Sequence, residues 1–262
     1  MELGYRIMRP EDVGKQPLTF AQISLWRTAN WDVAEGERAV TEAIEMAAAC
    51  KARGIRTVYH PLEYPLTGEH ASQTPGVLRR LAAEADLGII IHDEGGAGGK
   101  PLTPGEERTF EEMLAGISSL CPVSLENSFN SGDITRFWER FVAPAPDSVS
   151  ITLDIGHLEL AGLDSTQFVR DLPRKLIERI RFVHMHHHDA GDLHPVKDHK
   201  PLIPGCREIE ALNVLRERKK DLWVILELDA SENGMRESIG LLRERGMPTG
   251  EKAGGVVDPD KT

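Results

Sequence analysis

The chain has 262 residues, of which 40% are hydrophobic and 28% are charged, and its formal net charge is −11 at pH 7. This length allows one large core, and the acidic balance argues against a broad basic face for nucleic acid. No apolar run reaches the roughly 20 residues of a membrane helix, and the N-terminus has no signal-peptide core. We therefore expect a cytoplasmic protein that is not membrane-bound. Three widely spaced cysteines without a CxxC pattern predict buried free thiols.

Eight short apolar or β-branched runs predict β-strands. They cover residues 3–8, 19–26, 55–60, 87–92, 122–126, 149–154, 180–186 and 222–228. Helical periodicity and helix-end signals predict helices at residues 36–53, 104–119, 164–178, 207–219 and 233–246. This alternation of strands and helices predicts a parallel sheet, and eight strands predict a closed (β/α)8 TIM barrel of the α/β class.

The two ends of the chain depart from a regular barrel pattern. The first strand is weak, and residues 9–18 are too short and proline-broken for a crossover helix. We therefore expect an irregular first β/α unit, and an open or seven-stranded sheet is the alternative fold. No linker divides the chain, so residues 1–246 are predicted to form one domain. The segment 247–262 is rich in glycine, proline and charge, which predicts a flexible tail.

Residues of metal-binding type recur at the ends of the predicted strands, about one β/α unit apart. In chain order they are His60, His92, Glu126, Asp154, His184 and Glu227. Because the C-terminal ends of barrel strands meet around one mouth, these side chains are predicted to converge. The last four would supply three oxygen ligands and one nitrogen ligand to a single divalent cation.

The segments after the sixth and seventh predicted strands supply further candidates. In Asp154-x-x-His157, Gly156 is expected to take a sharp backbone turn that brings His157 over the pocket as a ligand or substrate contact. Alternation along a strand puts His184 and His186 on one face, so either could be the ligand. A long loop then brings Asp198 and His199 within reach of the mouth. The remaining histidines of this stretch, at 187, 188 and 194, are expected to face solvent.

These motifs resemble the xylose-isomerase-like TIM barrels, a superfamily that includes sugar isomerases, sugar epimerases and the endonuclease IV family. The resemblance covers most of residues 40–230. It rests on AIEMAAACKARGIRTVYHP, SLEN, ITLDIGH, the FVHMHHHD…DHKPLIPG stretch and ILE at 225–227.

In the isomerase branch, the resemblance implies one manganese, magnesium or zinc ion held by Glu126, Asp154, His184 and Glu227, with the two glutamates as the acid/base pair. The expected substrate is a small sugar or sugar phosphate, contacted by His157, Lys197 and Lys200. Ketose epimerases of this fold carry an arginine where this chain has Ala190, which argues against a ketohexose epimerase. Homo-oligomerisation is compatible with the sequence but is not specified by it.

In the endonuclease IV branch, the resemblance implies that His60, His92, His157 and a late Asp/His pair join the same four residues to hold three zinc ions. His199 matches the late histidine, but Lys197 occupies the place of the aspartate, and Asp198 is adjacent. The alternative function is therefore a zinc-dependent phosphodiesterase with two or three zinc ions. A third hypothesis is an inactive barrel that binds a metabolite. The retained glutamates favour an enzyme.

Overall fold

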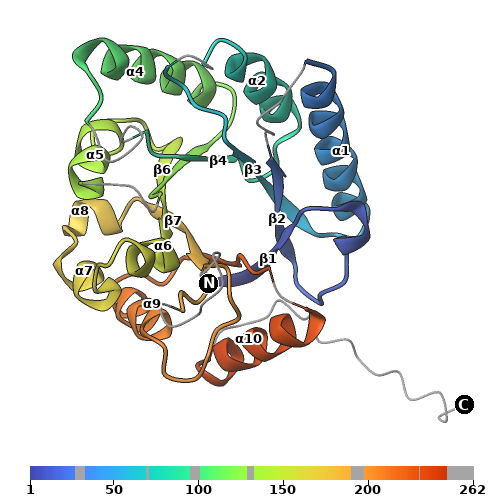
Figure 1. Cartoon of the computed structure of the whole chain (residues 1–262), viewed down its shortest axis with the longest axis vertical. Coiled ribbons are helices and arrows are strands. Elements are labelled where there is room, and N and C mark those ends of the chain that lie inside the picture. Colours follow the sequence, from blue (N-terminus) through green and yellow to red (C-terminus); the bar gives the residue numbers. More distant parts are fainter. Residues whose placement is uncertain are drawn as a thin grey trace, which may run out of the picture.

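The computed structural model describes residues 1–26, 33–68, 71–94, 101–128, 133–189, 198–229 and 231–246. Eight strands form a closed barrel in sequence order (Figure 1). They are β1 (Glu2–Ile7), β2 (Phe20–Trp26), β3 (Arg56–Leu62), β4 (Ile89–His92), β5 (Val123–Glu126), β6 (Val149–Asp154), β7 (Ile180–Met185) and β8 (Trp223–Leu226). Every neighbouring pair is parallel, so the predicted (β/α)8 fold is confirmed.

The first strand closes the barrel despite its weak sequence signal. In β1, Gly4 pairs with Phe20 of β2 on one side and with Ile225 of β8 on the other. The alternative of an open or seven-stranded sheet is therefore wrong. Between β1 and β2 the chain forms a single 3-10 turn, Pro10–Asp12, in place of a crossover helix. This confirms the expected irregularity of the first β/α unit.

Helices surround the barrel on its outside (Figure 1). In the described part of the chain they are α1 (Val33–Ala52), α2 (Thr74–Glu84), α4 (Pro104–Ser118), α5 (Ile134–Phe141), α6 (Ile155–Leu160), α7 (Ser165–Asp171), α8 (Arg174–Ile177), α9 (Arg207–Arg218) and α10 (Glu232–Glu244). The sequence prediction omitted α2, α5 and α6. The single helix predicted at 164–178 is two, because Pro173 cannot continue α7 and instead begins α8 as its N-cap.

The core has an inner and an outer part. Phe20, Val58, Leu87, Ile90, Phe182 and Ile225 form a separate buried cluster, made mostly of inward-facing strand residues. A larger apolar cluster lies between the strands and the surrounding helices. Strand alternation then carries the inward face from these apolar residues to polar ones at the C-terminal ends, for example from Phe182 to His184. The apolar inner cluster thus leaves that end of the barrel for a polar site.

All three cysteines are buried and free of disulfides, as predicted. No helix in the described ranges is long and apolar enough to cross a membrane. The predicted tail, residues 247–262, lies outside the described residues.

Candidate metal centre

The barrel register brings the predicted ligands together at the C-terminal ends of the strands. His92 of β4 is the register partner of Glu126 of β5, and Asp154 of β6 is the partner of His184 of β7. Glu227 follows the last residue of β8. Glu126, Asp154 and His184 are completely buried. These side chains share one end of the barrel because parallel strands end on the same side.

One imidazole nitrogen lies close to three carboxylates. Nδ1 of His184 is 3.0 Å from Oε1 of Glu126, 3.2 Å from Oε2 of Glu227 and 3.6 Å from Oδ2 of Asp154. Donors around a small divalent ion, with bonds of about 2.1 Å, are separated by roughly 3.0–3.5 Å. Glu126, His184 and Glu227, together with His60, each have one donor atom within 4.8 Å of the others, whereas Asp154 groups with Glu126 and His157.

Two further histidines approach Glu126 from β3 and β4. Nε2 of His60 is 3.2 Å from Oε2 of Glu126, and Nε2 of His92 is 3.7 Å from Oε1. The rings of His60 and His92 meet edge to face, with centroids 4.9 Å apart. Each oxygen of Glu126 thus faces imidazole nitrogens, an arrangement that suits a carboxylate bridging two ions as well as a carboxylate binding one.

Three histidines are oriented by hydrogen bonds between Nδ1 and a backbone carbonyl. Nδ1 of His60 bonds the carbonyl of Ile90 at 3.2 Å, Nδ1 of His157 bonds that of Asn127 at 3.0 Å, and Nδ1 of His199 bonds that of Glu227 at 2.9 Å. A carbonyl oxygen only accepts, so each Nδ1 carries the proton and each Nε2 keeps its lone pair. This is the usual support of metal-binding histidines.

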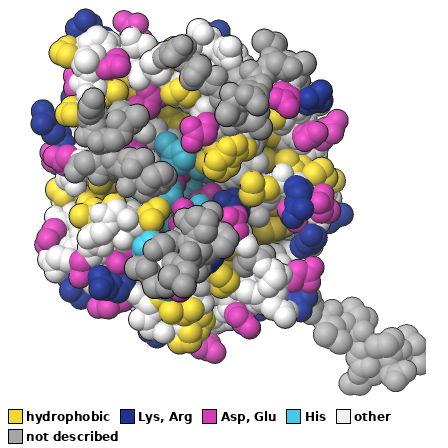
Figure 2. Space-filling model, in the orientation of Figure 1, with side chains coloured by type: hydrophobic (Ala, Val, Ile, Leu, Met, Phe, Trp, Pro, Cys, Tyr) yellow, Lys and Arg dark blue, Asp and Glu magenta, His cyan; other side chains and the backbone are white. Residues whose placement is uncertain are grey.

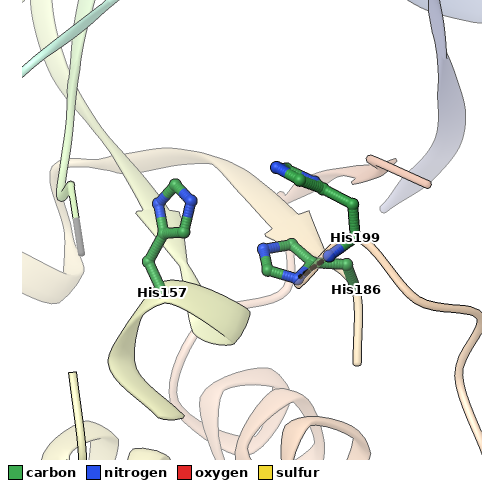
Figure 3. A group of neighbouring side chains, drawn as sticks. All are labelled: His157, His186 and His199. Atoms are coloured by element: carbon green, nitrogen blue, oxygen red, sulfur yellow. Dashed lines mark hydrogen bonds between the residues drawn. The ribbon is translucent and has the colours of Figure 1, made fainter. Parts of the chain in front are cut away.

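His186 has a different role from its neighbours, although His157, His186 and His199 form one cluster in which the three rings lie close together (Figure 3). Its Nδ1 accepts the backbone N–H of His199 at 3.0 Å, and its Nε2 donates to Asp154 at 3.1 Å. Both ring nitrogens are therefore used. This geometry favours His184 as the β7 ligand and gives His186 the task of holding Asp154 and His199 in place.

His199 is held in a backbone conformation that side chains rarely adopt. Its φ is 54°, in the left-handed region. Its N–H bonds the His186 ring, its carbonyl accepts the N–H of Asp229 at 2.9 Å, and its own ring bonds the Glu227 carbonyl. These contacts offset a strain of about 1–2 kcal/mol and fix the imidazole near the pocket.

Gly156 is needed for space and not for a special backbone angle. It lies inside α6 with an ordinary φ, and a Cβ built there would fall 2.2 to 2.5 Å from the ring atoms of His186. The expectation that Gly156 makes a sharp turn is therefore wrong. The turn is made by Asp154, whose side chain caps α6 through the backbone N–H of His157 at 2.7 Å.

The centre has less positive charge than its carboxylates need, and a divalent cation would supply the difference. Three buried carboxylates, on Glu126, Asp154 and Glu227, face Arg6 as the one permanently charged cation among their described partners. Burial raises carboxyl pKa values, but nearby histidines outweigh it and hold the pKa of Glu126 and that of Asp154 well below their usual range. Burial would likewise lower the pKa of His184, but Glu126 and Glu227 raise it, so a proton on this ring supplies part of the missing charge.

The residues present fit a metal. Nε2 of His60, Oε2 of Glu126 and Nε2 of His184 are buried and make no hydrogen bond to any described atom. Unsatisfied buried polar atoms are costly, at about 1–3 kcal/mol each, and metal coordination is one way to satisfy them. His60 also stays neutral, because burial lowers its pKa to about 4. A neutral imidazole is the form that binds metal.

A cavity of about 760 Å³ opens above this centre. In Figure 2 histidine side chains lie near the centre of the visible face, with acidic side chains beside them. His60, His92, His157, His199 and Glu227 line the cavity, whereas Glu126, Asp154, His184 and His186 lie behind its wall. Asp198 also lines it, 3.6 Å from Nε2 of His199. Lys200 is not among the described lining residues, and Lys197 and Ala190 lie outside the described residues.

Sequence reasoning missed several residues that position the site. Arg6 of β1 lies 3.5 Å from Oε1 of Glu227 and also pairs with Asp229, and Gln22 of β2 donates to the same Glu227 oxygen at 2.8 Å. Asn127 exchanges two hydrogen bonds of 2.8 Å with the backbone of Asp154. The usable signal was a polar residue on the inward face of a strand, which Arg6 and Gln22 share.

No protein-family model matches the chain, and no curated protein matches it by sequence. Solved structures do match. A probable 3-DHS dehydratase from Bacillus anthracis is 14% identical with a TM-score of 0.64, covering 95% of this chain and 100% of that one. A xylose isomerase domain protein from Planctomyces limnophilus is 14% identical with a TM-score of 0.61, covering 92% and 94%. D-Psicose 3-epimerase from Clostridium cellulolyticum H10 is 13% identical with a TM-score of 0.57, covering 93% and 98%. The fold of this chain is that of the xylose-isomerase-like TIM barrels.

Proposed function

We propose that the chain is a divalent-metal-dependent enzyme that moves a proton on a small, uncharged carbohydrate-like substrate, in the manner of sugar isomerases and epimerases. The observation that carries this proposal is the approach of His184 Nδ1 to oxygens of three buried carboxylates, at 3.0, 3.2 and 3.6 Å. Proteins of the same fold in the comparison include D-psicose 3-epimerase and L-ribulose 3-epimerase. Their shared architecture supports the reaction class.

Glu227 is the residue best placed to carry the proton. A cation bound beside it would polarise a substrate carbonyl and its neighbouring hydroxyl, making the C–H bond between them more acidic. Glu227 lines the cavity and would accept that proton and return it. Gln22 and Arg6 fix its Oε1. Burial alone would raise its pKa, but His184 and Arg6 hold the pKa well below the usual range, so the carboxylate is ionised and able to accept.

Glu126 is better suited to metal binding than to proton transfer. It is completely buried behind the cavity wall, and its oxygens face His60, His92 and His184. A substrate in the cavity would meet these histidines before it met the carboxylate. We therefore assign Glu126 as a ligand and narrow the acid/base pair predicted from the sequence to Glu227.

The charge of the cavity favours a neutral substrate over a phosphorylated one. Six acidic side chains line it, and Arg6 is the one lysine or arginine among the described lining residues. Arg6 is already paired with Glu227 and Asp229. Trp26, more than half exposed, offers an apolar face at the cavity rim. A polyol or free sugar suits this surface, whereas a phosphate group would be repelled.

The test is exchange of a substrate C–H hydrogen with solvent. The purified, metal-loaded protein is incubated with a panel of free ketoses and aldoses in D2O, and NMR follows deuterium incorporation and product formation. Glu227→Gln should abolish exchange, with a loss of about 100-fold or more, and should retain the fold. Glu63→Gln is the matched control, because Glu63 also lines the cavity but lies outside the metal centre. Exchange that survives in Glu227→Gln would contradict the assigned role.

The second candidate function is a multi-zinc phosphodiesterase related to endonuclease IV. It is favoured by the four histidines whose Nε2 atoms face Glu126 or the pocket: His60, His92, His157 and His199. Bound zinc ions would activate water for attack on phosphorus. The acidic cavity is the observation against it, since a phosphodiester needs cationic contacts.

Metal stoichiometry separates the two functions. Elemental analysis should give one exchangeable ion per chain at the barrel mouth for the isomerase, and the total count should stay the same in His92→Ala. Two or three zinc ions at the barrel mouth, with one lost in His92→Ala, together with nicking of abasic DNA, would instead favour the phosphodiesterase. His92 is the informative position because it contacts Glu126 but neither of the other two carboxylates at the centre.

A further inference from the structure

A second group of metal-binding side chains lies outside the barrel mouth. His187 follows β7, and Cys206 and Glu208 lie at the start of α9. One donor atom from each, a ring nitrogen, the thiol sulfur and a carboxylate oxygen, falls within 4.8 Å of the others. His187 was expected to face solvent, but its side chain is only 18% exposed. Strand alternation explains this, because His187 points to the opposite face from His186, toward the surrounding helices.

The three side chains already contact one another. Nδ1 of His187 is 3.0 Å from Oε1 of Glu208, and the Cys206 sulfur lies within 4.8 Å of a donor atom of each. Glu208 is buried, and its Oε1 also accepts the backbone N–H of His188 at 2.9 Å. The backbone of His187 is itself fixed by a pair of hydrogen bonds with Lys200, of 2.9 and 3.2 Å. The donors are therefore held by rigid backbone.

Next to these donors there is room for a ligand and a spare donor. A cavity of about 440 Å³ is lined by His187, His188, Cys206 and Glu208. Nδ1 of His188 is buried and makes no hydrogen bond within the described part of the chain. The cavity thus presents one thiol, one carboxylate and two imidazoles, and one of the four donor atoms is unsatisfied.

We propose that His187, Cys206 and Glu208 bind a second, structural divalent ion of the zinc class, separate from the metal centre at the barrel mouth. A mixed sulfur, nitrogen and oxygen donor set is typical of zinc, which is bound tetrahedrally at about 2.0–2.3 Å. Water would complete the fourth position. Cys206 loses its proton on binding, as thiol ligands do.

The position of this site in the chain indicates a structural role for the ion. His187 and Cys206 bracket the segment that carries Asp198 and His199 to the barrel mouth. An ion bound by His187, Cys206 and Glu208 would tie the end of β7 to the start of α9. Because His187 pairs with Lys200, the ion would also support the backbone next to His199. This inference is independent of the reaction proposed above, because it concerns only binding at Cys206.

Cobalt substitution tests the proposal with a signal that the barrel-mouth centre cannot give. Metal-free full-length protein is titrated with Co²⁺ alone, and absorption is followed in the near ultraviolet, where thiolate-to-cobalt charge transfer appears. The donors named at the barrel mouth are nitrogen and oxygen only. Wild-type protein should show the band, with an intensity at saturation equal to one thiolate-bound cobalt per chain whichever centre fills first, and Cys206→Ser should lose it. Cys121→Ser is the matched control, since Cys121 and Cys206 are both 7% exposed, and it should keep the band.

A second measurement on wild-type protein keeps the proposal testable if Cys206→Ser fails to fold. Zn²⁺ alone should slow alkylation of Cys206 by iodoacetamide by about tenfold or more, while Cys121 reacts at an unchanged rate, as peptide mapping will show. Absence of the charge-transfer band at saturating Co²⁺ overturns the proposal. So does a band that persists in Cys206→Ser, or alkylation of Cys206 that is unaffected by Zn²⁺.

Discussion

Replacing Gly156 by alanine would test the packing on which the histidine cluster depends. The added Cβ would fall 2.2 to 2.5 Å from three atoms of the His186 ring, closer than any real contact. His186 is completely buried, so its ring cannot move aside without displacing other groups. Relief of the overlap would break its bonds to Asp154 and to the N–H of His199.

The expected loss of stability is about 2–5 kcal/mol. Overpacking of a buried site contributes about 1–3 kcal/mol, and loss of two buried hydrogen bonds contributes a similar amount. The higher helix propensity of alanine returns up to about 1 kcal/mol. Urea unfolding of the metal-free protein measures the change. Gly116→Ala is the matched control, because Gly116 is also helical but a Cβ there would meet nothing within 4 Å. The control should be neutral or stabilised.

A double-mutant cycle shows whether the clash is the cause. In a His186→Ala background the ring is gone, so Gly156→Ala should become neutral or slightly stabilising. The same penalty in both backgrounds would refute the reasoning, as would wild-type stability in the single Gly156→Ala variant. Metal affinity, measured by competition with a chromophoric chelator, should also fall in Gly156→Ala, because His199 loses its anchor.

Three further predictions follow from burial and charge. Arg6→Leu should destabilise the protein by about 3–5 kcal/mol in urea, because Arg6 is 4% exposed and its loss leaves the buried Glu227 carboxylate without its cation. Arg9→Leu, at a side chain 70% exposed, should change the stability by less than about 1 kcal/mol, and similar losses in the two variants would contradict this. Chelation should lower the Tm of the wild type, because a cation at about 1,000 times its Kd stabilises the folded state by about 4 kcal/mol. In His184→Ala most of this decrease in Tm should be absent. A wild-type Tm that does not change with chelator would exclude a stabilising metal. Burial raises the pKa of Glu94 to about 7, so the folded state holds its proton more tightly than the unfolded chain does, and stability falls as pH rises from about 5 to 8. Urea unfolding measures the free energy of unfolding of Glu94→Gln relative to the wild type, and this difference should rise by at most about 3 kcal/mol in favour of the variant between pH 5 and pH 8. A difference that does not vary with pH would contradict the prediction.

Much of the fold could be predicted from local pattern. The strands at 149–154 and 180–185 carry apolar runs followed by a polar end, and their positions agree with the prediction to within a residue. Helices α2, α5 and α6 were missed because they are short, although α2 carries a proline in its first turn and α5 has Asp133 as its N-cap. The break within 164–178 could have been anticipated, because Pro173 is visible in the sequence.

The sequence by itself determined which residue types stand at the ends of the strands, because the apolar runs and the period of the β/α units are local properties of the chain. From this came the barrel and the prediction of a metal centre containing Glu126, Asp154, His184 and Glu227. Only the tertiary structure decided how the imidazoles divide their roles, because a ring nitrogen is committed by a partner far away in the chain. His186 is used on both nitrogens, whereas His60, His157 and His199 each bond a backbone carbonyl through Nδ1, which keeps the lone pair on Nε2. The tertiary structure also decided that Glu227 lines the cavity while Glu126 lies behind its wall, because the distance of a side chain from the cavity does not follow from spacing along the chain.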